Sequence, residues 1–495
     1  MKRNIFSVII ISLIGVISLG SCGNKADPIS DESVESFEDL SDSRDDNIFE
    51  VKNALESIDR VKEVNLNSNN GSFKCVFTVK YEQYIDHKNT EVGTFLQEME
   101  FGFNGFNVPN VMVTNGYGNT NSLYFCTYSS GENELAFLLG GNYLYVEHRY
   151  FGNSFPVQID YQDNTCWQYL TTEQAAADHH DIVTSFKTVF SGKWISTGMS
   201  KSGMTTHLYN LYYPGDVDLY VPYVAPFCNS ISDTRMMKFL YETAGNDQFG
   251  EEKAAKYRKE VLDFQIKMLE YRDTLAEKFY KAAKAYPLSS FATKDIVYDV
   301  AIIEFAIGTW QYYQEFMKIE KCLAMDESTE EALTKKMNAF YKQFTSVCAP
   351  GDFTYASSYA SYFVQSYQEL GNYGYDYHYI REALPEGVNL VIKEEEERDA
   401  YLKVILSDEM LKLERKELVY TKINNMLKTT EQKFIIIYGS SDPWYSVRPD
   451  DVFDNPNVKI YVDTKHPHTT HIGYFETDVR KEIINLVKSI LHLPQ

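Results

Sequence analysis

The sequence predicts an α/β fold in which a sheet is interrupted by a large helical insertion. Between residues 61 and 235, short apolar segments alternate with helix-like segments, which is typical of an α/β sheet. From 236 to 428 apolar residues recur at helical spacing, and from 429 to 495 strand-like apolar runs return. We therefore expect one domain made of two pieces, 61–235 and 429–495, with residues 236–428 forming a helical cap.

The first piece contains several candidate strands and one long candidate helix. Phe73–Lys80 and Thr94–Phe101 partly alternate apolar and polar residues, as half-buried strands do. A helix is expected over Thr171–Phe190. The other strand candidates are short apolar runs: Val108–Thr114, Tyr143–Val146, Trp194–Thr197 and Tyr220–Ala225.

The insertion begins with an apolar stripe whose members are spaced by 3, 4, 7 and 4 residues: Val261, Phe264, Met268, Leu275 and Phe279. This spacing predicts one long helix. Further helices are expected over Ile302–Met317, Glu330–Phe344 and Glu394–Met426. In the last piece, Phe434–Tyr438 and Val458–Val462 are predicted strands and Glu476–Leu491 is a predicted helix.

The N-terminus has the features of an export signal. A basic start is followed by the apolar run Ile5–Leu19, which is too short to span a bilayer comfortably, and then by Gly20-Ser21-Cys22. Leu19 to Cys22 resembles the bacterial lipobox. We expect residues 1–21 to be a lipoprotein signal peptide and Cys22 to be lipidated, which predicts an exported bacterial lipoprotein at the periplasmic face or the cell surface. An ordinary signal peptide that contains a cysteine is the alternative.

The charge of the chain is acidic and unevenly distributed. The 495 residues hold 47 Lys and Arg against 70 Asp and Glu, a formal net charge of −23, which argues against nucleic acid as the main partner. Residues 27–50 contain ten acidic side chains and one basic side chain, Arg44. Because charged, Ser-rich segments seldom fold, we expect residues 22–60 to be a flexible tether.

The cysteines and histidines give no sign of a metal or cofactor. Besides Cys22 there are six cysteines, none in a CxxC pair. Disulfides, which export would permit, and buried thiols remain equally open. We expect no cofactor and no metal.

A candidate nucleophile follows the predicted strand Trp194–Thr197. A strand, a tight turn of small residues and a helix are the context of a nucleophile elbow, in which a serine stands above the sheet edge. Here the turn and its flanks read Gly198-Met199-Ser200-Lys201-Ser202-Gly203-Met204. Ser200 is the expected nucleophile and the amide of Lys201 an expected oxyanion donor. Ser202 departs from the G-x-S-x-G pattern.

The acid and the base are expected after the insertion. In α/β hydrolases the triad runs Ser, acid, His along the chain. Asp442 comes just past the apolar strand Phe434–Tyr438, and His466, His468 and His471 follow the next strand. A histidine on that loop can accept the serine proton while Asp442 orients it. A metal site is the rival interpretation of three close histidines, and no carboxylate or cysteine spacing supports it.

Several segments in one order resemble the prolyl-specific serine exopeptidases related to lysosomal prolyl carboxypeptidase and dipeptidyl peptidase II. The bacterial secreted branch, the prolyl tri/tetrapeptidyl aminopeptidases, is the better match. The segments are Asp86-His87 with Gly93–Gln97, Gly116-Tyr117-Gly118, Glu147–Gly152, Tyr169–Ala175, Gly198–Thr205 and Asp442-Pro443-Trp444. Two departures, Met199 and Ser202 in place of glycine, leave room for altered activity.

The resemblance implies roles for particular residues. It assigns Ser200 as nucleophile, Asp442 as acid and His468 as base, with His466 and His471 as alternatives. Apart from the resemblance, a second oxyanion donor is expected at Tyr150, because the loop Arg149–Gly152 occupies the place after the third strand. The resemblance also implies peptide substrates with proline before the scissile bond.

Two further residues are candidates for substrate binding. Glu147 is a candidate ligand for the substrate ammonium, or else the ion-pair partner of Arg149. Trp444 is a candidate wall of the proline pocket, or else a core residue.

The function expected is therefore a lipid-anchored serine exopeptidase that releases short N-terminal peptides. A cap over the sheet edge would restrict entry to peptide ends. The alternatives are an inactive binding lipoprotein on a hydrolase scaffold and an esterase of the same fold.

Overall fold

The computed structural model describes residues 40–67, 73–118, 134–283, 289–354, 360–449 and 454–494. The chain divides into two compact units, Met1–Asn47 and Ile48–Gln495. Of the first unit, only the beginning of helix α1 (Leu40–Glu56) is described. All other elements belong to the second unit. No helix in the described ranges is long and apolar enough to cross a membrane.

The predicted tether is wrong in its C-terminal part. Residues 1–39, which include the expected signal peptide and Cys22, lie outside the described residues. The segment from Ile48 to Ile58, however, is packed into the protein, because α1 buries Val51 and Leu55 completely and Ile58 follows at 3% exposure. Ile48, Val51, Leu55 and Ile58 recur at spacings of 3, 4 and 3, so they form one apolar face inside an otherwise charged segment.

One mixed sheet organises the described part of the second unit. Its nine strands follow the order β1-β2-β3-β5-β4-β6-β7-β8-β9. The pairs from β1 to β5 are antiparallel, and all pairs from β5 to β9 are parallel. The strands are β1 Val61–Leu66, β2 Cys75–Tyr84, β3 Thr94–Phe103, β4 Asn110–Thr114, β5 Asn142–Val146, β6 Trp194–Met199, β7 Leu219–Tyr223, β8 Phe434–Gly439 and β9 Val458–Asp463.

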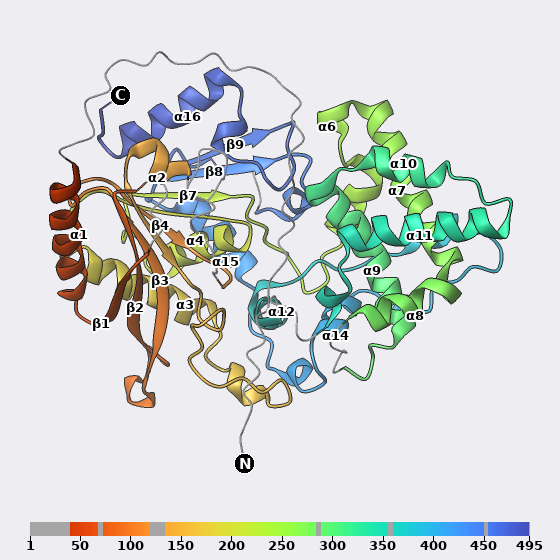
Figure 1. Ribbon diagram of the computed structural model, residues 1–495, viewed down its shortest axis with the longest axis horizontal. Coiled ribbons are helices and arrows are strands. Elements are labelled where there is room, and N and C mark those ends of the chain that lie inside the picture. Colours follow the sequence, from red (N-terminus) through yellow and green to blue (C-terminus); the bar gives the residue numbers. More distant parts are fainter. Residues whose placement is uncertain are drawn as a thin grey trace. The chain divides into compact units, whose positions relative to one another are not determined.

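Helices cover both faces of this sheet (Figure 1). Alternate residues of one strand point to opposite faces, so Met112 of β4 contributes to one apolar core and Val111 and Val113 to another. The first core also contains residues of α1, α3 (Thr172–Phe186), α4 (Lys201–Tyr212) and α15 (Val419–Thr429). The second contains residues of α2 (Glu134–Leu139) and α16 (Thr477–Ile490). Burial on both faces explains why the parallel strands are continuously apolar.

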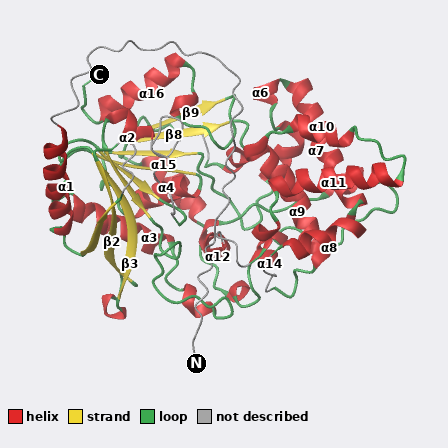
Figure 2. Ribbon diagram, in the orientation of Figure 1, coloured by secondary structure: helices red, strands yellow, loops and turns green. Residues whose placement is uncertain are grey.

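The described chain between β7 and β8 contains helices joined by loops, with no strand of the sheet among them, and forms the helix-rich part of Figure 2. The predicted α/β sheet with a helical interruption is therefore confirmed. The helices of this insertion are α5 Arg235–Lys238, α6 Asn246–Phe249, α7 Glu251–Glu270, α8 Arg272–Ala282, α9 Lys294–Gly308, α10 Phe316–Leu323, α11 Glu330–Val347, α12 Ala360–Gln365, α13 His378–Ala383 and α14 Ala400–Ile405.

Several expected helices are broken. The stripe predicted as one helix is divided at Tyr271 between α7 and α8. After α9 the chain continues as one π-helical turn, η5 (Thr309–Tyr313), before α10 begins. A second π-helical turn, η7 (Ser366–Leu370), follows α12. Such turns keep the helical spacing of apolar residues approximately intact, so periodicity does not detect them.

The described cysteines away from the N-terminus include free thiols at Cys166, Cys228, Cys322 and Cys348. Cys228 and Cys348 are buried, and burial raises the pKa of both thiols. Of the two interpretations left open by the sequence, the buried thiol therefore applies to these two residues. Cys126 lies outside the described residues.

Candidate active site

Ser200 occupies the turn between β6 and α4. Its φ of 59° and ψ of −122° are sterically unfavourable for a residue with a side chain. The conformation is held by two backbone hydrogen bonds, because the Ser200 amide donates to Tyr223 O at 2.9 Å and the Met204 amide donates to Ser200 O at 2.9 Å. Strained backbone that its surroundings fix in this way is typical of functional turns.

Small residues allow α4 to pack tightly against the sheet. A Cβ atom at Gly198 would lie 2.6 Å from the Cβ of Ser202, and one at Gly203 would lie 2.7 Å from Tyr223 O. Glycine is therefore required at both positions, because α4 and the sheet lie too close together there for a side chain. Met199, the first departure from the expected glycines, is partly buried at the end of β6.

The second departure, Ser202, is accommodated by hydrogen bonds. Its side chain is buried, and its Oγ accepts the Gly116 amide at 3.0 Å and donates to Asn115 Oδ1 at 3.1 Å. The hydroxyl thus connects the elbow to the loop that follows β4. The substitution adds a connection and leaves the turn intact.

Asp442 and His468 lie in contact beyond the ends of β8 and β9. His468 Nδ1 is 2.7 Å from Asp442 Oδ2, and both side chains are almost fully buried. Burial raises the pKa of Asp442, although the His468 ring and the Trp444 amide oppose this effect. Asp442 Oδ1 accepts that amide at 3.0 Å, which fixes the carboxylate. The other ring nitrogen, His468 Nε2, is buried and has no hydrogen-bond partner in the described structure.

The three histidines of this region face three different carboxylates. His466 Nδ1 lies 2.9 Å from Asp463 Oδ1, and His471 Nδ1 lies 2.8 Å from Glu134 Oε2. Only His468 of the three contacts Asp442. The geometry therefore favours His468 over both alternatives.

Tyr150 does not supply an oxyanion donor. Its amide donates to Ser154 O at 2.8 Å, and its hydroxyl donates to Cys166 O at 2.8 Å. The expectation failed because it placed the loop Arg149–Gly152 after the third strand of the series. In the sheet that loop follows β5, and β4 lies between β5 and the nucleophile strand β6.

The loop after β4 lies against the elbow instead. A Cβ atom at Gly116 would lie 2.5 Å from Lys201 Cδ and 2.7 Å from the Lys201 carbonyl carbon. Lys201 is the first residue of α4, where backbone amides lack acceptors within the helix. The signal was present in the sequence as Gly116-Tyr117-Gly118, but only the strand order shows that this segment is the neighbour of Ser200.

Glu147 is a structural residue of its loop. It is 2% exposed, and its Oε2 accepts the Asn153 amide at 2.8 Å and the Ser154 hydroxyl at 2.7 Å. A Cβ atom at Gly152 would overlap its Oε1. This carboxylate is therefore not placed to receive a substrate ammonium.

The alternative role of Glu147, an ion pair with Arg149, is also wrong. Arg149 forms a bidentate, fully buried pair with Asp178 of α3, with distances of 2.7 and 2.6 Å. Burial alone would raise the pKa of Asp178, but Arg149 and the His87 ring outweigh it and lower this pKa to about 2.

Trp444 lies between His468 and the insertion. Its ring centroid is 6.3 Å from that of His468 and 5.2 Å from that of Tyr373. The side chain is 9% exposed, and its Nε1 has no hydrogen-bond partner within the described residues. Trp444 is thus both a packing residue and a neighbour of the candidate base.

The π-helical turn η5 approaches the same histidine. The His468 amide donates to Gln311 O at 3.1 Å, and the Tyr312 ring meets the His468 ring edge-on at 5.4 Å. Tyr312 is nevertheless 50% exposed. The insertion therefore covers the candidate base while leaving solvent access beside Tyr312.

The similarity to known proteins agrees with this arrangement. A family model described as PS-10 peptidase S37 matches residues 45–453. The chain belongs to the peptidase S37 family. The resemblance inferred from the sequence motifs is thereby confirmed.

The individual relatives are distant from this chain in sequence. Prolyl tri/tetrapeptidyl aminopeptidase from Streptomyces mobaraensis is 26% identical over 320 residues, which cover 61% of this chain and 62% of that enzyme. Human lysosomal Pro-X carboxypeptidase is 30% identical over 148 residues, 26% of this chain and 30% of that protein. Proline iminopeptidase from Mycobacterium smegmatis matches 83% of this chain and 97% of its own at 12% identity with a TM-score of 0.35, a likeness too distant to bear on activity.

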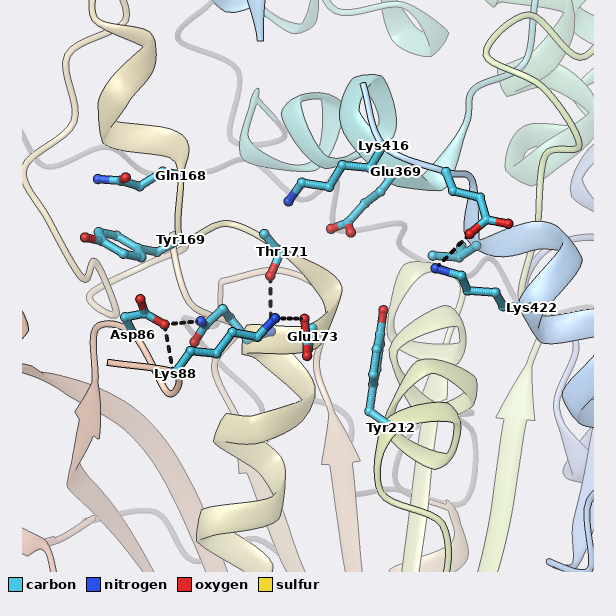
Figure 3. Close-up of a pocket in the computed structure, with 13 residues that line it drawn as sticks. Asp86, Lys88, Gln168, Tyr169, Thr171, Glu173, Tyr212, Glu369, Lys416 and Lys422 are labelled. Atoms are coloured by element: carbon cyan, nitrogen blue, oxygen red, sulfur yellow. Dashed lines mark hydrogen bonds and ion pairs between the residues drawn. The ribbon is translucent and has the colours of Figure 1, made fainter. Parts of the chain in front are cut away.

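The structure also contains a polar pocket of about 380 Å³ (Figure 3). Its lining combines residues of the first piece, such as Glu173 and Tyr212, with Glu369, Lys416 and Lys422. Ser200, Asp442 and His468 are not among its lining residues. Side chains of both charges line it, so its net charge does not select one kind of ligand.

Lys201 connects this pocket electrostatically to the elbow. Its side chain is buried, and burial lowers its pKa to about 7, although the Glu369 carboxylate opposes this effect. Glu369 itself accepts the Thr172 amide and hydroxyl. The backbone amide of Lys201 thus lies at the start of α4, and its side chain interacts electrostatically with Glu369, which lines the pocket.

Proposed function

We propose that this chain is a serine exopeptidase that releases short N-terminal peptides through Ser200, His468 and Asp442. The observation that carries the proposal is the contact between Asp442 and His468 Nδ1, which leaves a buried Nε2 without a partner. This is the arrangement that a general base needs before a nucleophile is aligned with it. Ser200 stands on a strained turn at the end of β6, the position of a nucleophile elbow.

The reaction would proceed through an acyl-enzyme. Ser200 Oγ attacks the scissile carbonyl carbon while its proton passes to His468 Nε2, and Asp442 stabilises the imidazolium that forms. The proton then passes to the leaving amine as the carbon–nitrogen bond breaks. Water, deprotonated by His468, next attacks the ester and releases the peptide acid and Ser200.

The oxyanion is expected at the N-terminus of α4. The Lys201 amide is one proposed donor, and the loop Asn115–Gly118 is the proposed source of the second because Gly116 contacts Lys201. Donors fixed before reaction stabilise developing charge without reorganisation.

Selectivity for peptide ends is proposed to come from the insertion. Gln311 and Tyr312 contact His468, so an internal segment of a folded protein would be obstructed there. The rings of Trp444 and Tyr373 offer an aromatic surface for a proline before the scissile bond, in keeping with the name of the Streptomyces relative.

Two reporters that differ only at the N-terminus test this proposal. Wild-type protein should hydrolyse an Ala-Ala-Pro amide reporter and cleave its acetylated form at least about tenfold more slowly, since an aminopeptidase requires a free ammonium. The Ser200→Ala variant should cleave neither. Equal rates on both reporters would contradict aminopeptidase activity, and activity in Ser200→Ala would contradict the assigned nucleophile.

We also propose export and lipid anchoring at Cys22, supported by the sequence of residues 1–22. An alkyne-tagged fatty acid should label the full chain expressed in a bacterial host and should not label Cys22→Ala. Equal labelling of the two forms would exclude this anchor.

A further inference from the structure

A buried carboxylate from a remote helix anchors the loop that carries the candidate base. Glu134, the first residue of α2, is fully buried. Its Oε1 accepts the Ile472 amide at 2.7 Å, and its Oε2 accepts the Gly473 amide at 3.0 Å and lies 2.8 Å from His471 Nδ1. Because an ionised carboxylate only accepts hydrogen bonds, this ring nitrogen is a donor. The three partners follow His468 closely in the chain, so Glu134 fixes one end of its loop.

The same carboxylate contacts the strand that holds the elbow. The hydroxyl of Tyr223, the last residue of β7, donates to Glu134 Oε1 at 2.9 Å. Burial and the Glu134 carboxylate raise the pKa of this tyrosine well above its ordinary value, so the hydroxyl stays protonated and remains a donor. The backbone carbonyl of Tyr223 accepts the Ser200 amide at 2.9 Å. Tyr223 thus contacts Glu134 with its side chain and the candidate nucleophile with its backbone.

The backbone beside Tyr223 is strained. Val224 has a φ of 42°, a left-handed conformation that is unfavourable for a β-branched residue. Its amide donates to Ile437 O of β8 at 2.8 Å, which helps to hold this conformation. Strain of this kind persists only where the surrounding contacts fix the segment, and it clusters at functional sites. The strain therefore indicates that the contact between Tyr223 and Ser200 is held in place by its surroundings.

The proposed chemistry requires a connection between the elbow and the histidine loop. Proton transfer needs the hydroxyl of Ser200 and Nε2 of His468 within hydrogen-bonding reach, and a displacement of about 1 Å can cost about 100-fold in rate. The two residues follow β6 and β9, and β7 and β8 lie between these strands in the sheet. Glu134 spans this separation, because it contacts both the loop of His468 and the tyrosine that holds Ser200.

We propose that Glu134 is a positioning residue that holds His468 and Ser200 in place for proton transfer. It acts through Tyr223 and residues 471–473, and the inference rests on the serine exopeptidase function proposed above. Each oxygen of the carboxylate accepts from two donors. An uncharged amide of the same length cannot replace it, because its nitrogen would face two of these donors.

The test compares Glu134→Gln with wild type in the full chain. Since the amide nitrogen faces two donors, either the loop of His468 or Tyr223 must shift. The rate constant for labelling Ser200 with a fluorophosphonate should therefore fall by about 10- to 100-fold. On the free Ala-Ala-Pro reporter, kcat should fall by a similar factor and KM should stay within about twofold, since the carboxylate does not bind substrate.

Two further variants complete the test. Glu482→Gln is the matched control, because Glu482 of α16 also accepts a tyrosine hydroxyl, from Tyr461 of β9 at 2.8 Å, but is exposed. It should be labelled at the wild-type rate. Tyr223→Phe loses one hydroxyl, keeps the carbonyl that holds Ser200, and should be labelled about three- to tenfold more slowly. If Glu134→Gln does not fold, a wild-type rate in Tyr223→Phe overturns the inference.

The extent of labelling separates positioning from a loss of folded protein. Slow labelling of Glu134→Gln that still reaches one adduct per chain shows displaced catalytic groups in an intact fold, as proposed. Labelling of only a fraction of the chains, at the wild-type rate, would show that Glu134 serves folding alone and would overturn the inference.

Failure of the inference and failure of the proposed function give different results. Wild-type labelling rates in both Glu134→Gln and Tyr223→Phe would overturn the inference and leave the exopeptidase function standing. If the wild-type protein is not labelled on Ser200, both fail together. If it is labelled but cleaves no reporter, the aminopeptidase proposal fails, and the labelling rates still decide the role of Glu134 because they do not depend on a peptide substrate.

Discussion

At the scale of single residues, the candidate chemistry depends on which acid faces which histidine. Asp442 contacts His468 and Asp463 contacts His466, at 2.7 and 2.9 Å respectively. The two pairs follow successive strands and look alike in sequence. Of these two pairs, Asp442–His468 is the one that is almost fully buried, and its ring nitrogen Nε2 has no partner in the described structure; the Glu134–His471 pair shares both features but does not include Asp442.

The Asp442→Asn substitution should therefore abolish most activity. An amide no longer stabilises the imidazolium and favours the wrong tautomer, so kcat should fall by about 10⁴-fold. Steady-state hydrolysis of the Ala-Ala-Pro reporter measures this loss. Asp463→Asn is the matched control and should retain activity within about threefold, whereas similar losses in the two variants would refute the assignment of the acid.

At the scale of elements, the elbow depends on the close approach of α4 to β6. Gly198→Ala would introduce a Cβ atom 2.6 Å from the Ser202 backbone, so we expect a loss of about 1–3 kcal/mol in the free energy of unfolding. Denaturant unfolding measures the change. Gly351→Ala adds a methyl group where no atom lies within 4 Å and should change stability by less than about 0.5 kcal/mol. Equal stability of the two variants would contradict the packing described for the elbow.

Elements with continuous apolar sequences could be predicted closely. Trp194–Thr197 and Phe434–Tyr438 each lie within the observed strands β6 and β8, because a buried parallel strand must be apolar on both faces. The segment Glu394–Met426, predicted as one helix, instead contains a 3-10 turn at Glu394–Glu396, a short α14 and then α15. Where such a segment divides into shorter helices is determined by its packing against the rest of the protein, which the local sequence does not show.

The residues of the candidate site could be predicted where the signal lies in the adjacent sequence. Ser200, Asp442 and His468 each follow a strong strand signal, and the structure brings Asp442 and His468 together. Tyr150 and Glu147 failed because their assignment required the order of strands in the sheet.

At the scale of the whole molecule, the second unit begins at Ile48, which is earlier in the chain than the acidic composition of residues 27–50 suggests. Helix α1 carries part of an acidic segment, yet Val51 and Leu55 are fully buried in the core that also holds α3 and α4. Electrostatic composition alone predicts a tether here. A few apolar residues at helical spacing suffice to dock the segment.

Leu55→Ala should therefore destabilise the protein by about 2–5 kcal/mol, the cost of a buried cavity. Thermal or denaturant unfolding measures this loss. Phe49→Ala, at a position that is 68% exposed on the same helix, is the control and should be nearly neutral. A tether would tolerate both substitutions equally.

Treatment of the protein with a fluorophosphonate probe, followed by peptide mass spectrometry to locate the adduct, tests most directly whether Ser200 is a nucleophile activated by His468. We predict one adduct per chain on Ser200, slow formation of the adduct in His468→Ala and no adduct in Ser200→Ala. Absence of labelling in wild type, or undiminished labelling of Ser200→Ala, would contradict this prediction.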